Sequence, residues 1–485
     1  MPDKAVTSSG EARGAGAVTL RRALGRWDLV LLFVVAIFNL NVIPSIAANG
    51  ATTTWLWILA LGLFFWPQGI AVVELAHRYP GEGGVYLWTK EVFGDWNGFL
   101  SGWCYWTNNM MYVPTVMLYF VGVSVFMFGP RYASLADNKA FALSVSVILL
   151  VLLVVLNIAG LNVGKWINNL GALGAGFAAL VLIGLGVIVA VRFRAGISAA
   201  DFALPADTRS VLNSFGVICY ALVGLELASV MGDEIENPRK TLPGAVAWGG
   251  ILSGILYVGA TLTLLIAISK TKISVLQGVV QAVSAMAERV HAAWIVVPFS
   301  FLLSLSIAGI GSAWLGGSAR IPFVAGLDSY MPAWLGKLHP KYATPYAALV
   351  VHAAVSLVLI VLNFALVGSS VEESFQRLLS LSVVLQLIPF IYMFLALLRI
   401  ALSRPFVRGH YSQGTLILAG LSGCLTTIVG IAVVFFPAQQ IKSLLSYEVW
   451  MFGGTLCFVG MAAFFFFVYG KRKVAGRGAV AESAP

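Results

Sequence analysis

The feature that most constrains this chain is a series of long intervals that contain no Asp, Glu, Lys or Arg. A helix needs about 20 predominantly apolar residues to cross the hydrocarbon core of a bilayer. The first interval, Leu29–Val73, is long enough for two such helices with a hinge at residues 49–52. Another segment, Ser210–Gly232, is interrupted only by Glu226. The remaining intervals each hold one helix: Trp96–Pro130, Ala140–Gly164, Trp166–Val191, Thr241–Ser269, Ala292–Ala319, Tyr342–Val371, Leu378–Leu398, Gly409–Ile441 and Val449–Gly470.

These intervals predict an all-α polytopic membrane protein with about twelve transmembrane helices. Composition agrees, because only 10% of the residues are charged, whereas soluble domains carry about 25%. A short helix over Val85–Phe93 is expected at the membrane surface, after a turn that contains Pro80, Gly81, Gly83 and Gly84. The expected spans cover roughly residues 28–48, 54–77, 97–129, 140–160, 167–191, 210–232, 243–269, 290–318, 343–367, 374–400, 413–437 and 447–470.

The net charge of +10 is interpreted as a signal of membrane orientation rather than of nucleic-acid binding. Roughly two thirds of the 30 Lys and Arg residues fall on one side of the expected spans, the side that holds both termini. We therefore expect cytoplasmic termini and a plasma (inner) membrane location, although Arg192, Arg194 and Arg209 lie in an outward loop. Residues 1–25 and 471–485 are predicted to be flexible cytoplasmic tails without a signal peptide. The four cysteines show no spacing typical of a disulfide or metal site, and no cofactor is implied.

The first expected span contains a stretch that is unfavourable for a continuous helix, FNLNVIPSI over residues 38–46. Pro44 lacks an N–H and its ring clashes with the carbonyl of Leu40, so that carbonyl loses its helical partner. Asn39 and Asn41 would point to nearly opposite faces of a regular helix. If the helix unwinds between them, both side chains can serve one cavity.

A second half-helix is then expected to begin near Pro44, a favoured first-turn residue. Its free amides, around Ser45 and Ile46, would direct the positive end of the helix dipole at a substrate carboxylate. The alternative is a simple proline kink in which the Asn side chains bond to neighbouring helices.

The sixth expected span is also interrupted, in the sequence YALVGLE from Tyr220 to Glu226. Gly224 lies beside a carboxylate deep in the span, and an intramembrane ionisable residue indicates a functional site. Burial favours the protonated carboxyl, so Glu226 can carry a proton; alternatively, it accepts hydrogen bonds from the broken backbone of the first span. Glu74, nearer the inner end of the second span, is interpreted as a gate or loop anchor. Interrupted helices at matching positions of two halves are typical of a transporter site.

Two further spans contain candidate polar contacts. In the third, either Asn108 or Asn109 can face a cavity while the other packs, and the sequence does not decide between them. In the eighth, Ser304 and Ser306 are hydroxyl ligands for a sodium ion in one interpretation, together with carbonyls freed in the first span. In the other interpretation they are close-packing residues of neighbouring helices.

Three segments resemble the amino acid–polyamine–organocation superfamily, and its amino acid permease family in particular. They are the following: WPQGIAVVELAHRYPGEGGVYLWTKEVFG (Trp66–Gly94), FGVICYALVGLELASVMGDEIENPRKTLPGA (Phe215–Ala245) and SARIPFVAGLDSYMPAWLGKLHPKYATP (Ser318–Pro345). The resemblance implies a leucine-transporter-type five-plus-five inverted repeat, here residues 26–200 and 201–402. Two additional helices would occupy residues 403–470.

The resemblance also implies proton-driven or exchange transport of amino acids or polyamines. Gly224 and Glu226 match the family's break in the sixth span, and Asn109 matches a polar contact in the third. The chain departs from the family at the first break, where Asn39, Asn41 and Pro44 replace small Gly and Ser residues. It also has no lysine within the fifth span beyond Lys165, so a lysine-based coupling device does not transfer.

The predicted function is secondary active transport of a small amino acid by alternating access, with a proton or sodium as the coupling ion. Polyamine uptake is the alternative, but a polycation needs several carboxylates in its cavity. A transporter-like nutrient sensor also fits, whereas no nucleophile–base or HExxH pattern favours an enzyme. Oligomeric state is not indicated. The expected substrate contacts are Asn39, Asn41, Val42, Pro44, Ser45, Asn108, Asn109, Tyr220, Ala221 and Gly224.

Overall fold

The computed structural model describes residues 27, 30, 33, 37–79, 84–159, 161–193, 196–204, 208–226, 238–319, 330–342, 344–366 and 370–470. Several sequence predictions fall on residues outside these ranges: the two tails, the turn at residues 80–83, the end of the expected sixth span, and parts of the second and third family-like segments at residues 227–237 and 320–329. The described chain is all-helical.

Ten helical stretches in the described chain are long and apolar enough to cross a membrane. They are Thr53–Arg78, Asp95–Phe128, Lys139–Ala159, Leu173–Phe193, Thr241–Ala267, Ala293–Ser318, Tyr346–Phe364, Val371–Leu402, Gln413–Val434 and Leu444–Gly470. These coincide with the expected spans other than the first and sixth, which are the two predicted to be interrupted.

The helices carry the following labels and bounds: α2 (Ile43–Ala47), α3 (Thr53–Ala60), α4 (Trp66–Arg78), α5 (Gly84–Phe93), α6 (Asp95–Ser124), α7 (Lys139–Ala159), α8 (Leu161–Phe193), α9 (Arg209–Ala221), α11 (Pro238–Ala267), α12 (Gly278–Arg289), α13 (Val296–Ser318), α15 (Tyr346–Leu366), α16 (Val371–Leu402), α17 (Gln413–Val434) and α18 (Leu444–Ala463). A π-helical stretch, η1 (Leu61–Phe65), joins α3 to α4, and another, η10 (Phe464–Gly470), extends α18. Short 3₁₀ turns are η2 (Val125–Phe128), η3 (Pro130–Asp137), η4 (Ala199–Phe202), η6 (Lys270–Lys272), η7 (Ala293–Ile295) and η9 (Ala333–Gly336).

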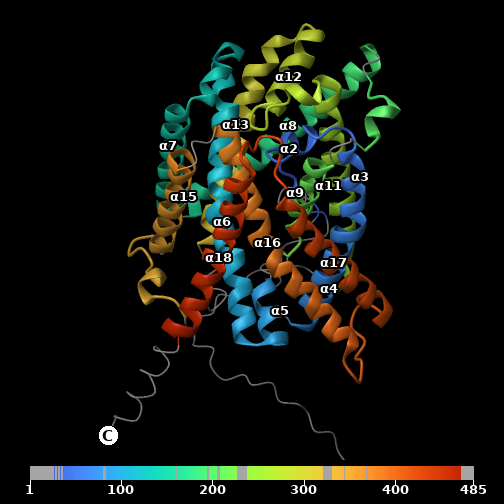
Figure 1. Ribbon diagram of the computed structural model, residues 1–485, viewed down its shortest axis with the longest axis vertical. Coiled ribbons are helices and arrows are strands. Elements are labelled where there is room, and N and C mark those ends of the chain that lie inside the picture. The colour runs from blue at the N-terminus through green and yellow to red at the C-terminus, as the bar shows by residue number, and fades with distance from the viewer. Residues whose placement is uncertain are drawn as a thin grey trace, which may run out of the picture.

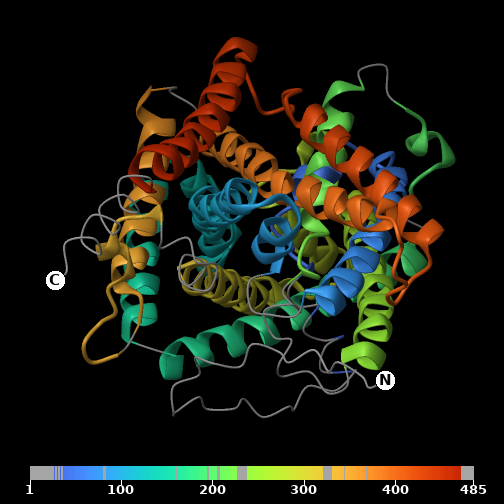
Figure 2. The ribbon, with the colours of Figure 1, turned by 90° about the horizontal axis from the view of Figure 1, so that it is seen from below.

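The long helices run roughly side by side, with α12 at one end of the bundle and α5 at the other (Figure 1). Among the candidate spans, the stretch that contains α6 is the most buried and the one that contains α18 the least. The view along the bundle shows α6 near the middle, with other helices arranged around it (Figure 2). Residues on α6 are therefore placed to line a central site.

The structure confirms the expected local features and adds one helix that was not expected. The hinge after α2 occurs at Gly50, whose φ of +91° is the left-handed region that glycine tolerates. A helix covers Gly84–Phe93, as expected. The eighth span, expected from about residue 290, begins at Ala293, and the amphipathic helix α12 that lies before it was not expected. Because α12 ends in Glu288 and Arg289, a search for charge-free intervals does not find it.

Candidate functional site

The first break comprises residues 38–42. Residue 37 is helical, residues 38–42 are irregular or turn, and α2 begins at Ile43 with Pro44 in its first turn, as predicted. The Leu40 carbonyl, which Pro44 deprives of a helical partner, accepts a hydrogen bond from the Tyr119 hydroxyl at 3.3 Å. A neighbouring helix thus satisfies the backbone group that the proline releases.

One expectation about the first break is wrong. The Ile46 amide is not free, because it donates to the Val42 carbonyl at 3.3 Å. This is the first regular α-helical bond of α2, whose N-cap residue is Val42. The Ile46 amide therefore does not offer an anion site at the start of α2.

The second break comprises residues 222–226, after α9 ends at Ala221. Gly224 has a φ of +141°, a conformation that side-chain-bearing residues rarely adopt. Its N–H donates to Oε2 of Glu226 at 2.9 Å. The helix therefore unwinds at the predicted glycine, and the carboxylate two residues later holds the unwound backbone.

Glu226 is buried and receives hydrogen bonds from two other helices. The Tyr105 hydroxyl on α6 donates to Oε1 at 3.0 Å, and Nε2 of Gln68 on α4 donates to Oε2 at 3.2 Å. The tethering role expected for Glu226 is present, but the amide that it holds is that of Gly224 in its own segment. Glu226 thereby links the second break to α4 and α6.

Cavity A lies between the two breaks and is lined by Asn39, Val42, Asn108, Tyr112, Tyr220, Ala221, Val223, Trp314 and Gln386. Among the predicted substrate contacts, it gathers Asn39, Val42, Asn108, Tyr220 and Ala221. None of its lining residues is an acid or a base. Its space of about 20 Å³ holds little more than a water molecule, so the walls must separate to admit an organic solute.

The walls of cavity A combine aromatic rings with side-chain amides. Tyr112 makes edge contacts with Tyr220 and Trp314, with ring centroids 6.0 and 5.8 Å apart. On the other side, Asn108 Nδ2 donates to Gln386 Oε1 at 2.7 Å. Asn108 Oδ1 has no hydrogen-bond partner among the described residues. Buried polar atoms are normally paired, so this acceptor is available to a bound ligand.

The structure distinguishes the two asparagines of α6. Asn108 lines cavity A, whereas Asn109 Nδ2 bonds back to the Tyr105 carbonyl at 3.1 Å on its own helix. The Asn109 backbone carbonyl contacts Nε2 of the buried His352 at 3.0 Å. Asn108 therefore lines cavity A, whereas Asn109, which the family resemblance favoured as the polar contact, does not.

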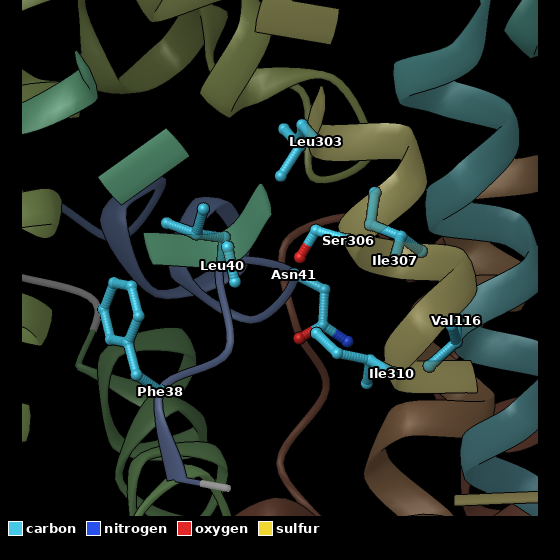
Figure 3. A pocket seen from close by; sticks show the side chains of 9 residues that line it. Phe38, Leu40, Asn41, Val116, Leu303, Ser306, Ile307 and Ile310 are labelled. Atoms are coloured by element: carbon cyan, nitrogen blue, oxygen red, sulfur yellow. The ribbon is translucent and has the colours of Figure 1, made fainter. Parts of the chain in front are cut away.

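Cavity B is a second small space of about 10 Å³, lined by Phe38, Leu40, Asn41, Val116, Ala175, Leu303, Ser306, Ile307 and Ile310. Figure 3 shows Asn41 among these mostly apolar side chains, with Ser306 on the facing helix α13. Neither polar atom of the Asn41 amide has a hydrogen-bond partner among the described residues, although the amide lies near the Tyr112 hydroxyl. The expectation that Asn39 and Asn41 serve one cavity is wrong, because they line separate ones.

The two serine candidates lie on α13 near this second space. Ser306 lines cavity B, and the Ser304 hydroxyl is buried without a partner among the described residues. Small residues nevertheless bring α8 and α13 close together, since a Cβ on Gly171 would lie 2.8 Å from the Gly309 Cα. Ser306 thus lies in a tightly packed helix interface, and Ser304 does not line cavity B.

Glu74 forms a buried anchor for the segment between α16 and α17. Its Oε2 accepts the backbone amides of His410 and Tyr411 at 2.9 and 3.1 Å, and its Oε1 pairs with Arg78 at 2.7 Å. A Cβ on Gly409 would lie 2.1 Å from this carboxylate, so only glycine permits the approach. These contacts match the loop-anchor interpretation.

Sequence reasoning missed several residues that organise the site: Gln68, Tyr105, Tyr112, Tyr119, Tyr257, Trp314 and Gln386. Each carries a polar group inside an apolar interval, where water is not available to satisfy it. A polar side chain within an apolar interval is visible in the sequence and could have identified these residues as candidates. Which group each one contacts depends on helices that are distant in the chain, so the contacts themselves were not predictable.

Two interrupted helices that face each other across a small enclosed polar cavity, within an apolar helical bundle, define a membrane transporter architecture. The crystal structure of MhsT in complex with L-phenylalanine has the same fold, with a TM-score of 0.57 at 12% identity, over 85% of this chain and 99% of that one. The fold is therefore of the leucine-transporter type.

Sequence comparisons identify the family. The profile described as "Amino acid permease" matches residues 24–468. The "Probable agmatine/putrescine antiporter AguD" of Lactococcus lactis is 26% identical over 89% of this chain and 92% of its own. The "Branched-chain amino acid permease BcaP" of Bacillus subtilis is 25% identical over 70% of this chain and 74% of its own. The chain belongs to the amino acid permease family of membrane transporters and is not an enzyme.

Proposed function

We propose that this protein is a secondary active transporter that moves a small amino acid across the cell membrane by alternating access, coupled to protons as a symporter or exchanger. We further propose twelve spans, of which the first ten form two inverted repeats, and cytoplasmic termini. The observation that carries the proposal is cavity A, an amide- and aromatic-lined space between two broken helices beside a buried carboxylate. Substrate would bind there, and the bundle that carries the breaks would move.

The lining of cavity A favours a zwitterion over a polycation. The amide of Asn108 offers an unpaired oxygen for a substrate ammonium, and the rings of Tyr112, Tyr220 and Trp314 offer apolar surface. A diamine would need carboxylates near both of its ends, whereas Glu226 already accepts three hydrogen bonds outside the lining. Polyamine transport is kept as the alternative because the relative AguD is named as a probable agmatine/putrescine antiporter.

A proton is a better candidate for the coupling ion than sodium. Glu226 is a buried titratable group attached to the moving part of the second break, and burial in a membrane favours the neutral carboxyl. Sodium needs a shell of several oxygen atoms, whereas the lining of cavity B is apolar apart from Asn41 and Ser306.

The proposal is tested by a thermal-shift screen of amino acids and polyamines on the purified protein, followed by uptake into proteoliposomes. We expect stabilisation by one or a few small amino acids and accumulation driven by a proton gradient, with no requirement for sodium. Stabilisation by putrescine or agmatine alone would favour the polyamine alternative. Binding without counterflow would identify a sensor.

The substitution Glu226→Gln tests the coupling role. It keeps the side-chain shape but cannot carry a proton, so we expect pH-driven accumulation to be lost while exchange of substrate across the membrane continues. Glu74→Gln is the matched control, because it removes an equally buried carboxylate that anchors a loop. It should retain the pH dependence. Full pH-driven uptake by Glu226→Gln would show that the proton role is wrong.

A further inference from the structure

We propose that the Tyr257 hydroxyl is a joint that fixes the first break to the second and thereby sets the geometry of the substrate site. Tyr257 is a positioning residue in this proposal, because its contacts are with backbone groups of the two breaks. The transport consequence rests on the proposed function, whereas the structural consequence can be measured without any substrate.

The hydroxyl of Tyr257 reaches three backbone groups of the two breaks. It accepts a hydrogen bond from the Asn39 amide at 3.0 Å. It also lies within donating distance of the Ile37 carbonyl at 2.5 Å and of the Ala221 carbonyl at 3.0 Å. Its single proton serves one of these two carbonyls at a time or is shared between them.

All three backbone groups are ones that the interruptions release from helical hydrogen bonding. Ile37 is the last helical residue before the first break, and Ala221 ends α9 before the second. Carbonyls at such ends have no partner within their own helix, and an unpaired group in a bilayer costs several kcal/mol. A phenol hydroxyl suits the position because it can both donate and accept.

The ring of Tyr257 is held rigidly, so the hydroxyl has little freedom to move. Tyr257 is fully buried on α11 and stacks on Trp57 of α3, with ring centroids 4.3 Å apart and planes inclined by 19°. Trp57 Nε1 in turn donates to the Thr261 hydroxyl, one turn along α11, at 3.2 Å. The Phe38 ring lies 5.1 Å away on another side.

Tyr257 therefore connects four segments. It lies on α11, its hydroxyl contacts the first and second breaks, and its ring stacks on α3. These segments belong to the first, second, sixth and seventh spans, and in the proposed alternating access we expect these four spans to move together. Asn39 and Ala221 both line cavity A as well. The joint therefore keeps the two halves of the cavity in register while the bundle moves as one body.

Tyr257→Phe tests the joint, since it preserves the ring and its stacking but removes the hydroxyl. We expect amide hydrogen exchange at residues 37–43 and 221–226 to accelerate about tenfold, because three backbone groups lose a partner. Substrate affinity should weaken by a similar factor, and transport should slow. Thr261→Val is the matched control on the same helix. It removes the partner of Trp57 Nε1 and is expected to lower thermal stability while leaving exchange at the breaks and substrate affinity unchanged.

The outcomes separate this proposal from the proposed function. Unchanged exchange at both breaks in a folded Tyr257→Phe protein would overturn the joint, whatever the wild-type protein binds. Equal loss of affinity in Tyr257→Phe and Thr261→Val would also overturn it, since general loosening of α11 would then be the cause. Accelerated exchange in a protein whose wild type binds no amino acid or amine would support the joint and overturn the proposed function.

Discussion

At the scale of single residues, neighbouring side chains of the same type have different roles because of helix rotation. Successive residues of an α-helix are rotated by about 100°, so Asn108 faces cavity A while Asn109 bonds to its own helix. Asn39 and Asn41, which lie in the unwound segment rather than in a helix, are also divided between cavity A and cavity B. Residue type alone therefore does not assign a substrate contact in this protein.

The two asparagines of α6 provide a matched pair for testing cavity A. Asn108→Ala removes the unpaired amide oxygen and leaves Gln386 without its donor, so we expect substrate affinity to fall about tenfold. Asn109→Ala removes a bond to the preceding turn and an amide that does not line cavity A, so it should change affinity little. Ligand titration by thermal shift or calorimetry measures both. The opposite ranking of the two variants would contradict the assignment of cavity A as the substrate site.

At the scale of helices, each of three prolines within the spans leaves a backbone carbonyl without a helical partner, and that carbonyl accepts a hydrogen bond from a hydroxyl group on a neighbouring helix. Pro44 leaves the Leu40 carbonyl without a helical partner, and this carbonyl accepts a hydrogen bond from the Tyr119 hydroxyl. Pro67 does the same to the Leu63 carbonyl, which accepts hydrogen bonds from the hydroxyls of Ser422 at 3.0 Å and Thr426 at 3.2 Å. Pro114 on α6 releases Met110, which accepts from Ser356 on α15 at 3.2 Å. Interruption and interhelical hydrogen bonding are therefore coupled features of this bundle.

A double-mutant cycle tests that coupling at α6 and α15. Ser356→Ala alone should lower the melting temperature, because the Met110 carbonyl loses its partner, at a cost of about 0.5–2 kcal/mol. In a Pro114→Ala background the helix can restore the missing N–H, so the same serine substitution should then cost much less. Thermal unfolding of the four proteins gives the interaction energy. Additive effects would show that the serine and the proline act independently.

At the scale of the whole molecule, both cavities are closed around spaces of about 20 Å³ or less. A site that must hold an organic solute has to open by movement of whole helices, because its walls come from segments far apart in the chain. The contacts at Tyr257 tie four of those segments together, whereas α6, α13 and α16 contribute the facing walls. This division fits alternating access by one bundle moving against another.

Accessibility of a cavity residue from each side of the membrane tests this motion. Val223 lines cavity A and is 7% exposed, and the chain has four native cysteines to remove first. We expect Val223→Cys in a cysteine-free background to react slowly with impermeant thiol reagents applied from either side. Bound substrate should protect it from both. Reaction from one side only, with no protection by substrate, would contradict alternating access through cavity A.

The class of the protein, most of its spans and both interruptions follow from the order of its amino acids without any structure. Bilayer thickness fixes the length of a spanning helix, and water-free surroundings make every unpaired group costly. Charge-free intervals, Pro44 and Glu226 are therefore strong signals that need no knowledge of distant contacts. Charge-free intervals do not predict the helix α12, because it is amphipathic and short.

Which side chains contact one another depends on the tertiary structure. Asn39 and Asn41 line different cavities, and Asn108 rather than Asn109 lines cavity A. Tyr257 contacts backbone groups 36 and more than 200 positions away. Such pairings depend on helix rotation and packing, which interior shape and close contacts set jointly across the whole chain. The sequence places polar groups in the membrane, and the packing of the bundle assigns each one its partner.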